Sequence, residues 1–212
     1  MSEEVAKEEV IEIIIKIAEK IVKNTDKLSE LDSKIGDSDH GDNMKRGFKK
    51  IIEEEDKIKD KTTIKEVFNK VAEFITFEVG GSAGPLFGNL FIEFGKTFNN
   101  NKKLNINKLP EAFSNSMQAV QDLGNAEVGD KTMVDTLNPV VEYLMGVEVK
   151  NLGCEDLLYN IKQKAKEGME STRDISANKG RASYLNERSI GHIDPGAYST
   201  YLIIETVYEY YN

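Results

Sequence analysis

The sequence predicts an all-α protein, folded as an antiparallel up-and-down barrel or bundle of about eight helices. Apolar residues recur at helical spacing along most of the 212 residues, and the strict alternation typical of half-buried strands is nearly absent. Glycine-rich pieces lie between the helical segments rather than inside them. These observations favour helices that each bury one apolar face and are joined end to end by turns.

The first helix is expected over about residues 5–29, and its glutamates and lysines fall away from a single apolar stripe. That stripe contains Val10, Ile14, Ile17 and Ile21. Thr62 and Thr63 form a plausible cap for the third helix. The other seven helices are expected from soon after Gly41 to about 57, then over 62–79, after Pro85, and over 107–122, 132–146, 154–172 and 196–211.

Length and composition predict a single domain over residues 1–212. A hydrophobic content of 39% supplies one core, and no linker rich in Pro, Gly or Ser divides the chain. The net charge of −9 argues against a broad nucleic-acid surface. No apolar run approaches the roughly 18–20 residues of a membrane span, and no signal peptide is evident. Cys154 is the sole cysteine, which excludes internal disulfides. We expect a cytoplasmic protein that binds neither nucleic acid nor membranes.

Four glycine-rich pieces lie at the junctions between helices one and two, three and four, five and six, and seven and eight. Alternate junctions of an up-and-down bundle lie at the same end. We therefore expect the four pieces to converge in one site at that end. They are LDSKIGDSDHGDNM (31–44), GGSAGPLFG (80–88), GNAEVGDKT (124–132) and NKGRASYLNERSIGHIDPGAYS (178–199).

Three aspartates in the first piece suit a hard divalent cation, because Mg²⁺ prefers oxygen ligands. Asp37 and Asp39 are two residues apart, so an extended backbone would point both side chains the same way. Asp32 would join them from the end of the preceding helix. Gly36 and Gly41 would let the chain bend tightly around them.

This piece has two other interpretations. Aspartate and glycine also make turns and cap helices without any metal, which is the usual role of an isolated Asp-x-Asp. A calcium EF-hand loop that starts at Asp37 is excluded, because its sixth residue would be Asp42 instead of Gly and its twelfth Phe48 instead of Glu.

The third piece nearly matches the phosphate loop G-x-x-x-x-G-K-[ST] but does not fit it. Asp130 stands between Gly129 and Lys131, and a helix rather than a strand is expected before the loop. This identification is therefore rejected, although Lys131 and Thr132 stay candidates for a different kind of nucleotide site.

The remaining pieces each have a functional and a structural interpretation. Small residues before a helix near Pro85 offer backbone N–H groups to an anion, or permit a tight turn. Arg181 and Arg188 suit phosphate through their planar guanidinium groups, or form surface ion pairs. His192 is expected to be structural. His40, among aspartates, is the better functional candidate, with a hydrogen bond to a carboxylate as the alternative.

Taken together, the pieces resemble the nucleotide-binding L subunits of the dihydroxyacetone kinases. The resemblance rests on LDSKIGDSDHGDNM, GGSAGPLFG, GDKTMVDTLNP and GRASYLNERSIGHIDPGA in this order, and it covers essentially the whole chain. It implies an antiparallel eight-helix barrel with nucleotide at one end. It also implies two Mg²⁺ ions on Asp32, Asp37 and Asp39. The implied ADP or ATP contacts are His40, Gly41, Asp42, Asn43, Ser82, Ala83, Gly124, Met133, Arg181, Asp194, Pro195 and Gly196.

The chain departs from the family pattern at Asp42, where a small uncharged residue is common. An extra negative charge near phosphate argues against a side-chain contact there, whereas the backbone N–H stays available. The order of Ser82 and Ala83 is a milder departure. Phosphoryl transfer needs positioning and charge stabilisation rather than a protein nucleophile, so Arg181 is the candidate catalytic residue.

The resemblance also implies partners. Dihydroxyacetone would be held covalently on a histidine of a separate K subunit, so neither His40 nor His192 is expected to hold it. Because the chain contains only the L-like part, a phosphotransferase-system kinase is expected, in which an M subunit rephosphorylates bound ADP.

Other functions stay open at this point. The chain could serve an ATP-dependent kinase of another triose or tetrose, or act as a regulatory module that contacts a transcriptional regulator. A fatty-acid kinase nucleotide domain is disfavoured, because its metal motif reads closer to PDGDTGTN than to GDSDHGDN. A purely structural bundle would leave the shared acidic and glycine-rich pieces unexplained.

Overall fold

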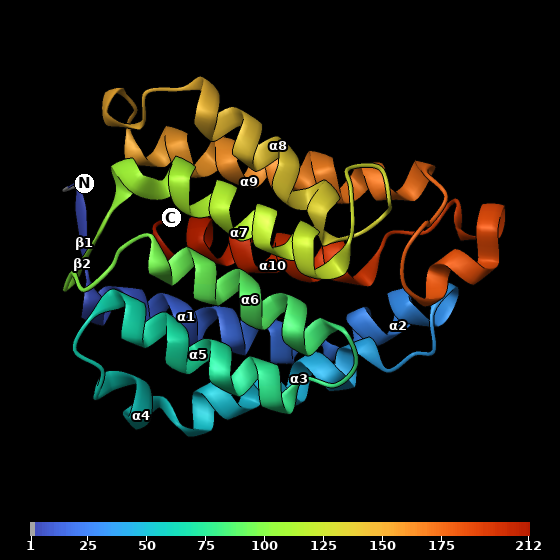
Figure 1. Cartoon of the computed structure of the whole chain (residues 1–212), viewed down its shortest axis with the longest axis horizontal. Helices are drawn as coiled ribbons and strands as arrows, with labels where there is room; N and C mark the ends of the chain where they lie inside the picture. Colours follow the sequence, from blue (N-terminus) through green and yellow to red (C-terminus); the bar gives the residue numbers. More distant parts are fainter. Residues whose placement is uncertain (1–2) are drawn as a thin grey trace.

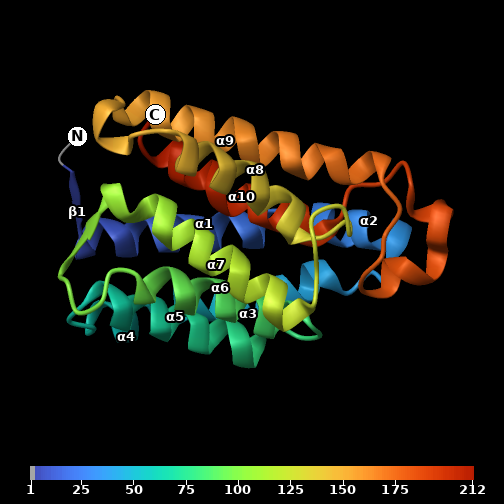
Figure 2. The ribbon, with the colours of Figure 1, turned by 45° about the horizontal axis from the view of Figure 1, so that its top comes forward.

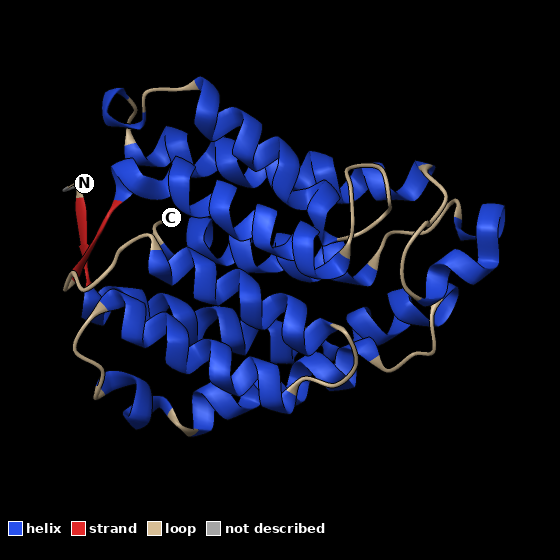
Figure 3. Cartoon of the chain, viewed as in Figure 1, coloured by secondary structure: helices blue, strands red, loops and turns tan. Residues whose placement is uncertain are grey.

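The computed structural model describes residues 3–212, and almost all regular structure in this range is helical (Figures 1 and 3). The predicted all-α class is confirmed. The α-helices in chain order are α1 (Lys7–Lys23), α2 (Thr25–Ile35), α3 (His40–Glu53), α4 (Glu55–Lys59), α5 (Ile64–Glu78), α6 (Ala83–Lys96), α7 (Leu109–Gly124), α8 (Met133–Gly146), α9 (Cys154–Ser171) and α10 (Pro195–Tyr210).

Two of the predicted helices are divided in the structure. The helix expected over residues 5–29 breaks at Asn24, whose amide side chain donates to the carbonyl of Lys20 at 2.8 Å and ends α1. Side-chain bonds of this kind compete with the next helical turn. The helix expected to reach about residue 57 ends at Glu53, and the short α4 follows Glu54. Predicted helix boundaries elsewhere lie within a few residues of the observed ones.

The remaining regular structure is short. Strands β1 (Glu4–Ala6) and β2 (Lys103–Asn105) pair antiparallel with Val5 opposite Leu104, and both of these side chains are buried. Three-residue strands carry too little alternation to be predicted. The 3-10 segments are η1 (Ile106–Lys108), η2 (Val149–Asn151), η3 (Thr172–Asp174) and η4 (Arg181–Ser189).

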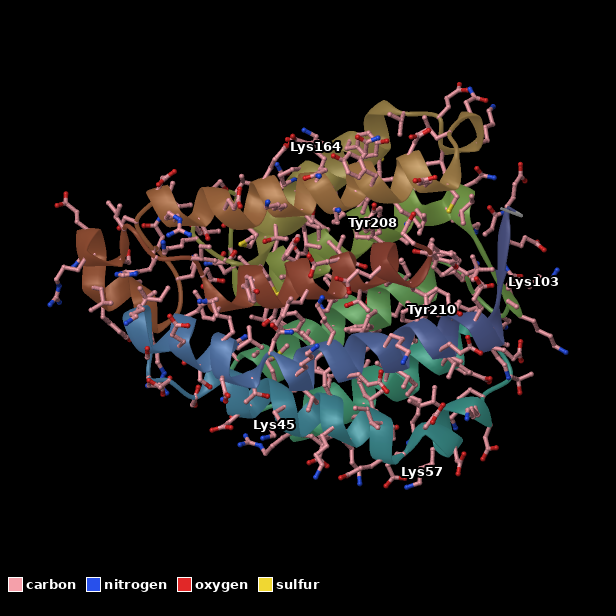
Figure 4. All side chains as sticks on the ribbon, turned by 180° about the vertical axis from the view of Figure 1, so that it is seen from behind. Lys45, Lys57, Lys103, Lys164, Tyr208 and Tyr210 are labelled. Atoms are coloured by element: carbon pink, nitrogen blue, oxygen red, sulfur yellow. The ribbon has the colours of Figure 1, made fainter. Side chains whose placement is uncertain are left out.

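The eight longer helices pack side by side in ring order. Each helix contacts the next one in the order α1, α3, α5, α6, α7, α8, α9, α10, and α10 contacts α1 (Figures 1 and 2). Each helix turns its apolar stripe inward, so Val10, Ile14, Ile17 and Ile21 of α1 are all buried. Full burial of such a side chain stabilises the fold by about 1.5–3 kcal/mol. Charged side chains cover the outside, among them Lys45 and Lys57 (Figure 4).

Gly168 of α9 permits a close approach of α9 to α8. A Cβ atom at this position would lie 2.2 Å from the carbonyl oxygen of Asp135 on α8. Only glycine allows the two backbones to meet here, at the N-terminal end of α8, directly after the third glycine-rich piece.

The two ends of the ring differ. The chain termini and the β1–β2 pair lie at one end, whereas α2, the start of α3 and η4 lie at the other (Figure 1). In the part of the chain that the structure describes, no helix combines the length and the apolar character that a membrane crossing needs.

Candidate functional site

A pocket of about 600 Å³ opens at the end of the ring that contains η4. Residues from all four glycine-rich pieces line it, so the structure brings these four junctions together. Thirteen of the fifteen residues predicted for the site lie on its wall. They are Asp32, Asp37, Asp39, His40, Asn43, Ser82, Ala83, Gly124, Met133, Arg181, Asp194, Pro195 and Gly196.

The other two predicted residues, Gly41 and Asp42, do not line the pocket. Gly41 lies against α2, where a Cβ atom would come within 2.3 Å of the carbonyl oxygen of Thr25. Its role in the fold is therefore close packing of α2 and α3. Asp42 is exposed in the first turn of α3, where a negative charge interacts favourably with the helix dipole.

Asp32, Asp37 and Asp39 each offer one carboxylate oxygen, and these three oxygens lie within 4.8 Å of one another. The first is buried at the end of α2, and the other two are exposed on the loop that follows. Three carboxylates at this separation offer the hard oxygen donors that Mg²⁺ prefers, so the donor set fits the implied metal. Repulsion among them also favours a bound cation.

The route by which the loop brings the carboxylates together differs from the expected one. The backbone between Asp37 and Asp39 is not extended, because Ser38 has a φ of +68° and turns the chain. Gly36 leaves room for the first carboxylate, since a Cβ atom there would lie 2.0 Å from Oδ1 of Asp32. The backbone N–H of His40 donates to Oδ2 of Asp32 at 3.1 Å and fixes its orientation.

Four helices begin at the pocket. Their first residues, His40 of α3, Ala83 of α6, Met133 of α8 and Pro195 of α10, all line it. The first N–H groups of a helix have no partner within the helix, and the N-terminal end of the helix dipole is positive. Four such ends and three carboxylates line one pocket, which suits a polyphosphate together with a metal ion.

Arg181 reaches the cluster from η4. Its Nη2 atom lies 2.8 Å from Oδ2 of Asp37, and its side chain is 67% exposed. Gly180, with a φ of +61°, directs the chain into this segment. An exposed ion pair stabilises a protein by only about 0–1 kcal/mol, so the guanidinium can leave the carboxylate for a phosphate at little cost.

His40 lies beneath the pocket and connects two helices. Its Nε2 atom is 2.9 Å from the hydroxyl of Ser199 on α10, and that hydroxyl donates to the carbonyl of Pro195 at 3.0 Å. The hydroxyl therefore accepts a hydrogen bond from Nε2–H. Burial lowers the pKa of His40 to about 4, although Asp39 opposes the shift, so the ring is neutral at pH 7.

Side chains cap two of the four helices that begin at the pocket, α8 and α10. Oδ2 of Asp194 accepts from the N–H of Ala197 at 2.7 Å, and burial raises the pKa of Asp194 to about 7. Thr132 caps α8 and forms a capping box with Asp135, whose other carboxylate oxygen accepts from the N–H of Gly129 at 2.6 Å. The last residue of the third piece, Thr132, is therefore the N-cap of α8.

Lys179 also lines the pocket but was not predicted, because it carries no local signal in the sequence. Lys131, a candidate for a different kind of nucleotide site, lines the pocket as well, and its ammonium donates to the carbonyls of Thr172, Ile175 and His192. Arg188, which was weighed for phosphate, does not line the pocket.

A family model described as the DAK2 domain matches residues 34–209. The chain belongs to the DAK2 domain family. Among curated proteins, it is 41% identical over 178 residues to the "PEP-dependent dihydroxyacetone kinase, ADP-binding subunit DhaL" of Escherichia coli, covering 84% of each chain. It is 38% identical to the "PTS-dependent dihydroxyacetone kinase, ADP-binding subunit DhaL" of Lactococcus lactis, covering 94% of this chain and 95% of that one.

The resemblance to L subunits of dihydroxyacetone kinases is therefore confirmed, and so is its placement among kinase subunits. A solved structure with the same fold is the dihydroxyacetone kinase of C. freundii "in complex with AMP-PNP and Mg2+". The TM-score is 0.74 at 24% identity, covering 94% of this chain and 33% of that chain. The DAK2 fold of this chain thus corresponds to about one third of the larger kinase.

Proposed function

We propose that this DAK2-domain chain is the nucleotide-binding, phosphoryl-transfer subunit of a dihydroxyacetone kinase. It holds ADP or ATP with two Mg²⁺ ions and passes a phosphoryl group to dihydroxyacetone on a separate K subunit. The observation that carries the proposal is the pocket, which three carboxylates and four helix N-termini line together. We further propose that residues 1–212 form one nucleotide-binding domain in the cytoplasm.

Asp32, Asp37 and Asp39 are the residues that would hold the ions. When bound, Mg²⁺ would neutralise phosphate charge and align the phosphoryl group between the attacking and leaving oxygens. Asp32 is fixed by the N–H of His40 and by the room at Gly36, so its carboxylate is positioned before the ligand arrives. The exposed Asp37 and Asp39 can adjust to the phosphates.

The polyphosphate would lie along the helix N-termini that begin at Ala83, Met133 and Pro195. Ser82 and Ala83 offer backbone N–H groups from the start of α6, where Gly81 at a φ of +66° lets the chain approach closely. Gly196 keeps this wall open at the start of α10, because a Cβ atom there would crowd the carboxylate of Asp194 at 3.0 Å. No side chain of this wall has to act as a nucleophile.

Arg181 is the proposed catalytic residue. Its guanidinium is within 2.8 Å of Asp37 and on an exposed segment, so it reaches the position at which the transferred phosphoryl group would meet the metal ligands. A permanently charged planar group there would stabilise the charge that develops during transfer. His40 is neutral and bonded to Ser199, which suits it to position α3 and α10 rather than to exchange protons.

A partner that carries the acceptor would dock at the pocket end. Large apolar side chains are exposed near the pocket mouth, where a soluble monomer gains nothing from them. They come from the last turns of α5 and α7, from the loop before α8, and from η4 and its end: Phe77, Leu123, Val128, Tyr184 and Ile190. In single-chain relatives such as the "L-erythrulose 1-kinase" of Mycolicibacterium smegmatis, the matching region is 33% of the length, which leaves room for the acceptor-binding part.

We propose a phosphotransferase system as the phosphate source. The relatives at 41% and 38% identity are named as PEP-dependent and PTS-dependent subunits, and this chain covers most of their length. ADP would then stay bound and be rephosphorylated in place by an M subunit. The number of metal ions, the K and M subunits and a contact with a transcriptional regulator are parts of this proposal.

The test is native mass spectrometry of gently purified protein, followed by reconstitution. We expect ADP and two Mg²⁺ ions to accompany the chain through dialysis with Mg²⁺ present. With K and M subunits and the phosphohistidine carriers added, we expect dihydroxyacetone phosphate to form without free ATP. A chain that arrives free of nucleotide and binds none on addition of Mg-ADP would contradict the proposal.

A second acceptor is worth including in the same assay, because relatives at 25–28% identity are named as erythrulose kinases. Turnover that requires free ATP and prefers erythrulose would replace the phosphotransferase version with an ATP-dependent tetrose kinase. Binding to the K subunit without turnover of either ketose would favour a regulatory role.

A further inference from the structure

Lys131 occupies a place that lysine rarely occupies. Its side chain is 1% exposed, and it is the single lysine or arginine among the buried residues that the structure describes. The backbone at Lys131 has a φ of +62°, a left-handed conformation that L-residues other than Asn, Asp and Gly seldom adopt. Both features cost stability, so the side chain must make contacts that offset them.

Those contacts are three carbonyl oxygens. The ammonium donates to the carbonyls of Thr172, of Ile175 at 3.2 Å and of His192 at 2.5 Å. An ammonium group has three N–H donors and no acceptor, so these bonds use all of them. Burial lowers the pKa of Lys131, and the nearby charges of Asp194 and Asp135 oppose this shift.

The three carbonyls lie at the two ends of one segment. Thr172 and Ile175 precede residues 176–191, and His192 follows them, so the ammonium joins both ends at its base. We call residues 176–191 the Arg181 segment, because this arginine is its link to the carboxylate cluster. Its ends are also joined by a hydrogen bond from Gly191 N–H to the carbonyl of Arg173 at 2.7 Å.

The residue before Lys131 holds the same segment. Asn178 donates through its backbone N–H to the carbonyl of Asp130 at 3.1 Å and through its side-chain amide to Oδ1 of Asp130 at 3.0 Å. The loop before α8 thus contacts the segment at two successive residues. Few apolar contacts secure it otherwise, since its buried cluster is limited to Ile35, Ala177 and Ala182, with Leu185 against them.

We propose that Lys131 is a positioning residue whose ammonium fastens the base of the Arg181 segment, thereby holding Arg181 over the carboxylates and Asp194 at the start of α10. This inference rests on the proposed function for its effect on nucleotide. A neutral side chain cannot replace the ammonium, because a methionine donates no hydrogen bond and an amide donates two. With its base open, the segment would regain conformational freedom that binding would have to remove again.

Hydrogen exchange tests the fastening without any ligand. In nucleotide-free Lys131→Met, whose side chain is similar in length and uncharged, we expect amides of residues 176–191 to exchange about tenfold faster or more. Amides of α5 and α6 should keep their wild-type rates. Lys131→Arg, which retains the cation, should restore much of the protection, and Lys166→Met on the exposed face of α9 should change nothing.

A double-mutant cycle then tests positioning rather than general stability. Lys131→Met and Arg181→Ala should each weaken Mg-ADP binding by about tenfold, and the double variant should be little weaker than either one. Independent effects that multiply to about a hundredfold would overturn the proposed link. Exchange in the segment that stays at the wild-type rate, or that rises equally in every helix, would also overturn the inference.

Two further outcomes are distinguishable. If the wild-type chain does not bind Mg-ADP, the proposed function fails, while the exchange measurement still decides whether Lys131 fastens the segment. If Lys131→Met does not fold, Lys131→Gln is measured in its place with the same criteria, because it keeps two of the three donors. Wild-type exchange in the Gln variant would overturn the inference.

Discussion

The two ends of the helical ring are built on different principles. The end with the termini encloses an apolar cavity of about 170 Å³, lined by aliphatic and aromatic side chains such as Ile14, Phe68 and Phe91. The pocket end gathers carboxylates, helix N-termini, and residues with positive φ such as Ser38 and Gly81. Packing stabilises the first end, whereas repulsion among like charges and left-handed backbone at residues such as Ser38 destabilise the second. Changes at the two ends should therefore separate stability from binding.

The largest effect is expected from the metal ligands. Asp37→Asn keeps the size of the side chain but removes the charge, so we expect Mg-dependent ADP affinity to fall by about a hundredfold or more while helical content is unchanged. Isothermal calorimetry and circular dichroism measure the two quantities.

The matched control is Asp42→Asn, which changes the same residue type on an exposed position that does not line the pocket. It should stay within about threefold of wild type. Equal losses for both variants would mean that overall charge, and not the cluster, governs affinity.

At the opposite end, Phe98→Ala should do the reverse. Phe98 is fully buried and packs against Phe94 with ring centroids 5.5 Å apart. Its truncation should lower the free energy of unfolding by about 3–5 kcal/mol. Chemical denaturation measures this loss, and Mg-ADP affinity at a temperature where the variant is folded should change by no more than about twofold.

The titration of Asp194 offers a test by pH. Because its pKa is raised to about 7, the folded state holds a proton that the unfolded state releases near pH 4. Its contribution to stability is therefore greatest below pH 4 and falls as the pH rises towards 7, by at most about 1.4 kcal/mol per pH unit. Asp194→Asn keeps an acceptor for the N–H of Ala197 and should flatten the profile of unfolding free energy against pH. If the slope of unfolding free energy against pH is unchanged in this variant, the carboxyl of Asp194 is not the source of the pH dependence.

The smallest effect comes from a matched pair of capping threonines. Thr132 caps α8 at the pocket, and Thr63 caps α5 at the other end, each within a capping box. Thr132→Ala and Thr63→Ala should each lower stability by about 1 kcal/mol. Only Thr132→Ala should also weaken Mg-ADP binding, by a few fold, because α8 begins at the pocket and α5 does not. Equal binding losses would remove the distinction between the two ends.

Periodic apolar residues were sufficient to predict the all-α class and most helix positions. The breaks at Asn24 and Glu54 were not predictable, because each depends on a local competition between side-chain or terminal hydrogen bonds and one further helical turn. The pairing of β1 with β2 joins segments about a hundred residues apart, and three residues carry too weak a pattern to reveal it.

The convergence of the pocket residues was predictable for a geometric reason, since alternate junctions of a helical ring share an end. The role of each residue within the pocket was less accessible. The ammonium of Lys131 finds acceptors 41 to 61 residues further along the chain, so its own loop contains no sign of them. Gly41 and Asp42 are the opposite case: they are adjacent in sequence to residues that line the pocket, but they do not line it themselves.

The presence of carboxylates and helix N-termini in one pocket has a thermodynamic consequence. A nucleotide that enters alone meets three negative charges, and a cation that enters alone leaves the amide wall unmatched. The two ligands should therefore be strongly and reciprocally linked, each raising the affinity of the other by the same factor. A chelator that removes Mg²⁺ would then release the nucleotide as effectively as a competing nucleotide, although the chelator leaves the contacts between nucleotide and protein untouched.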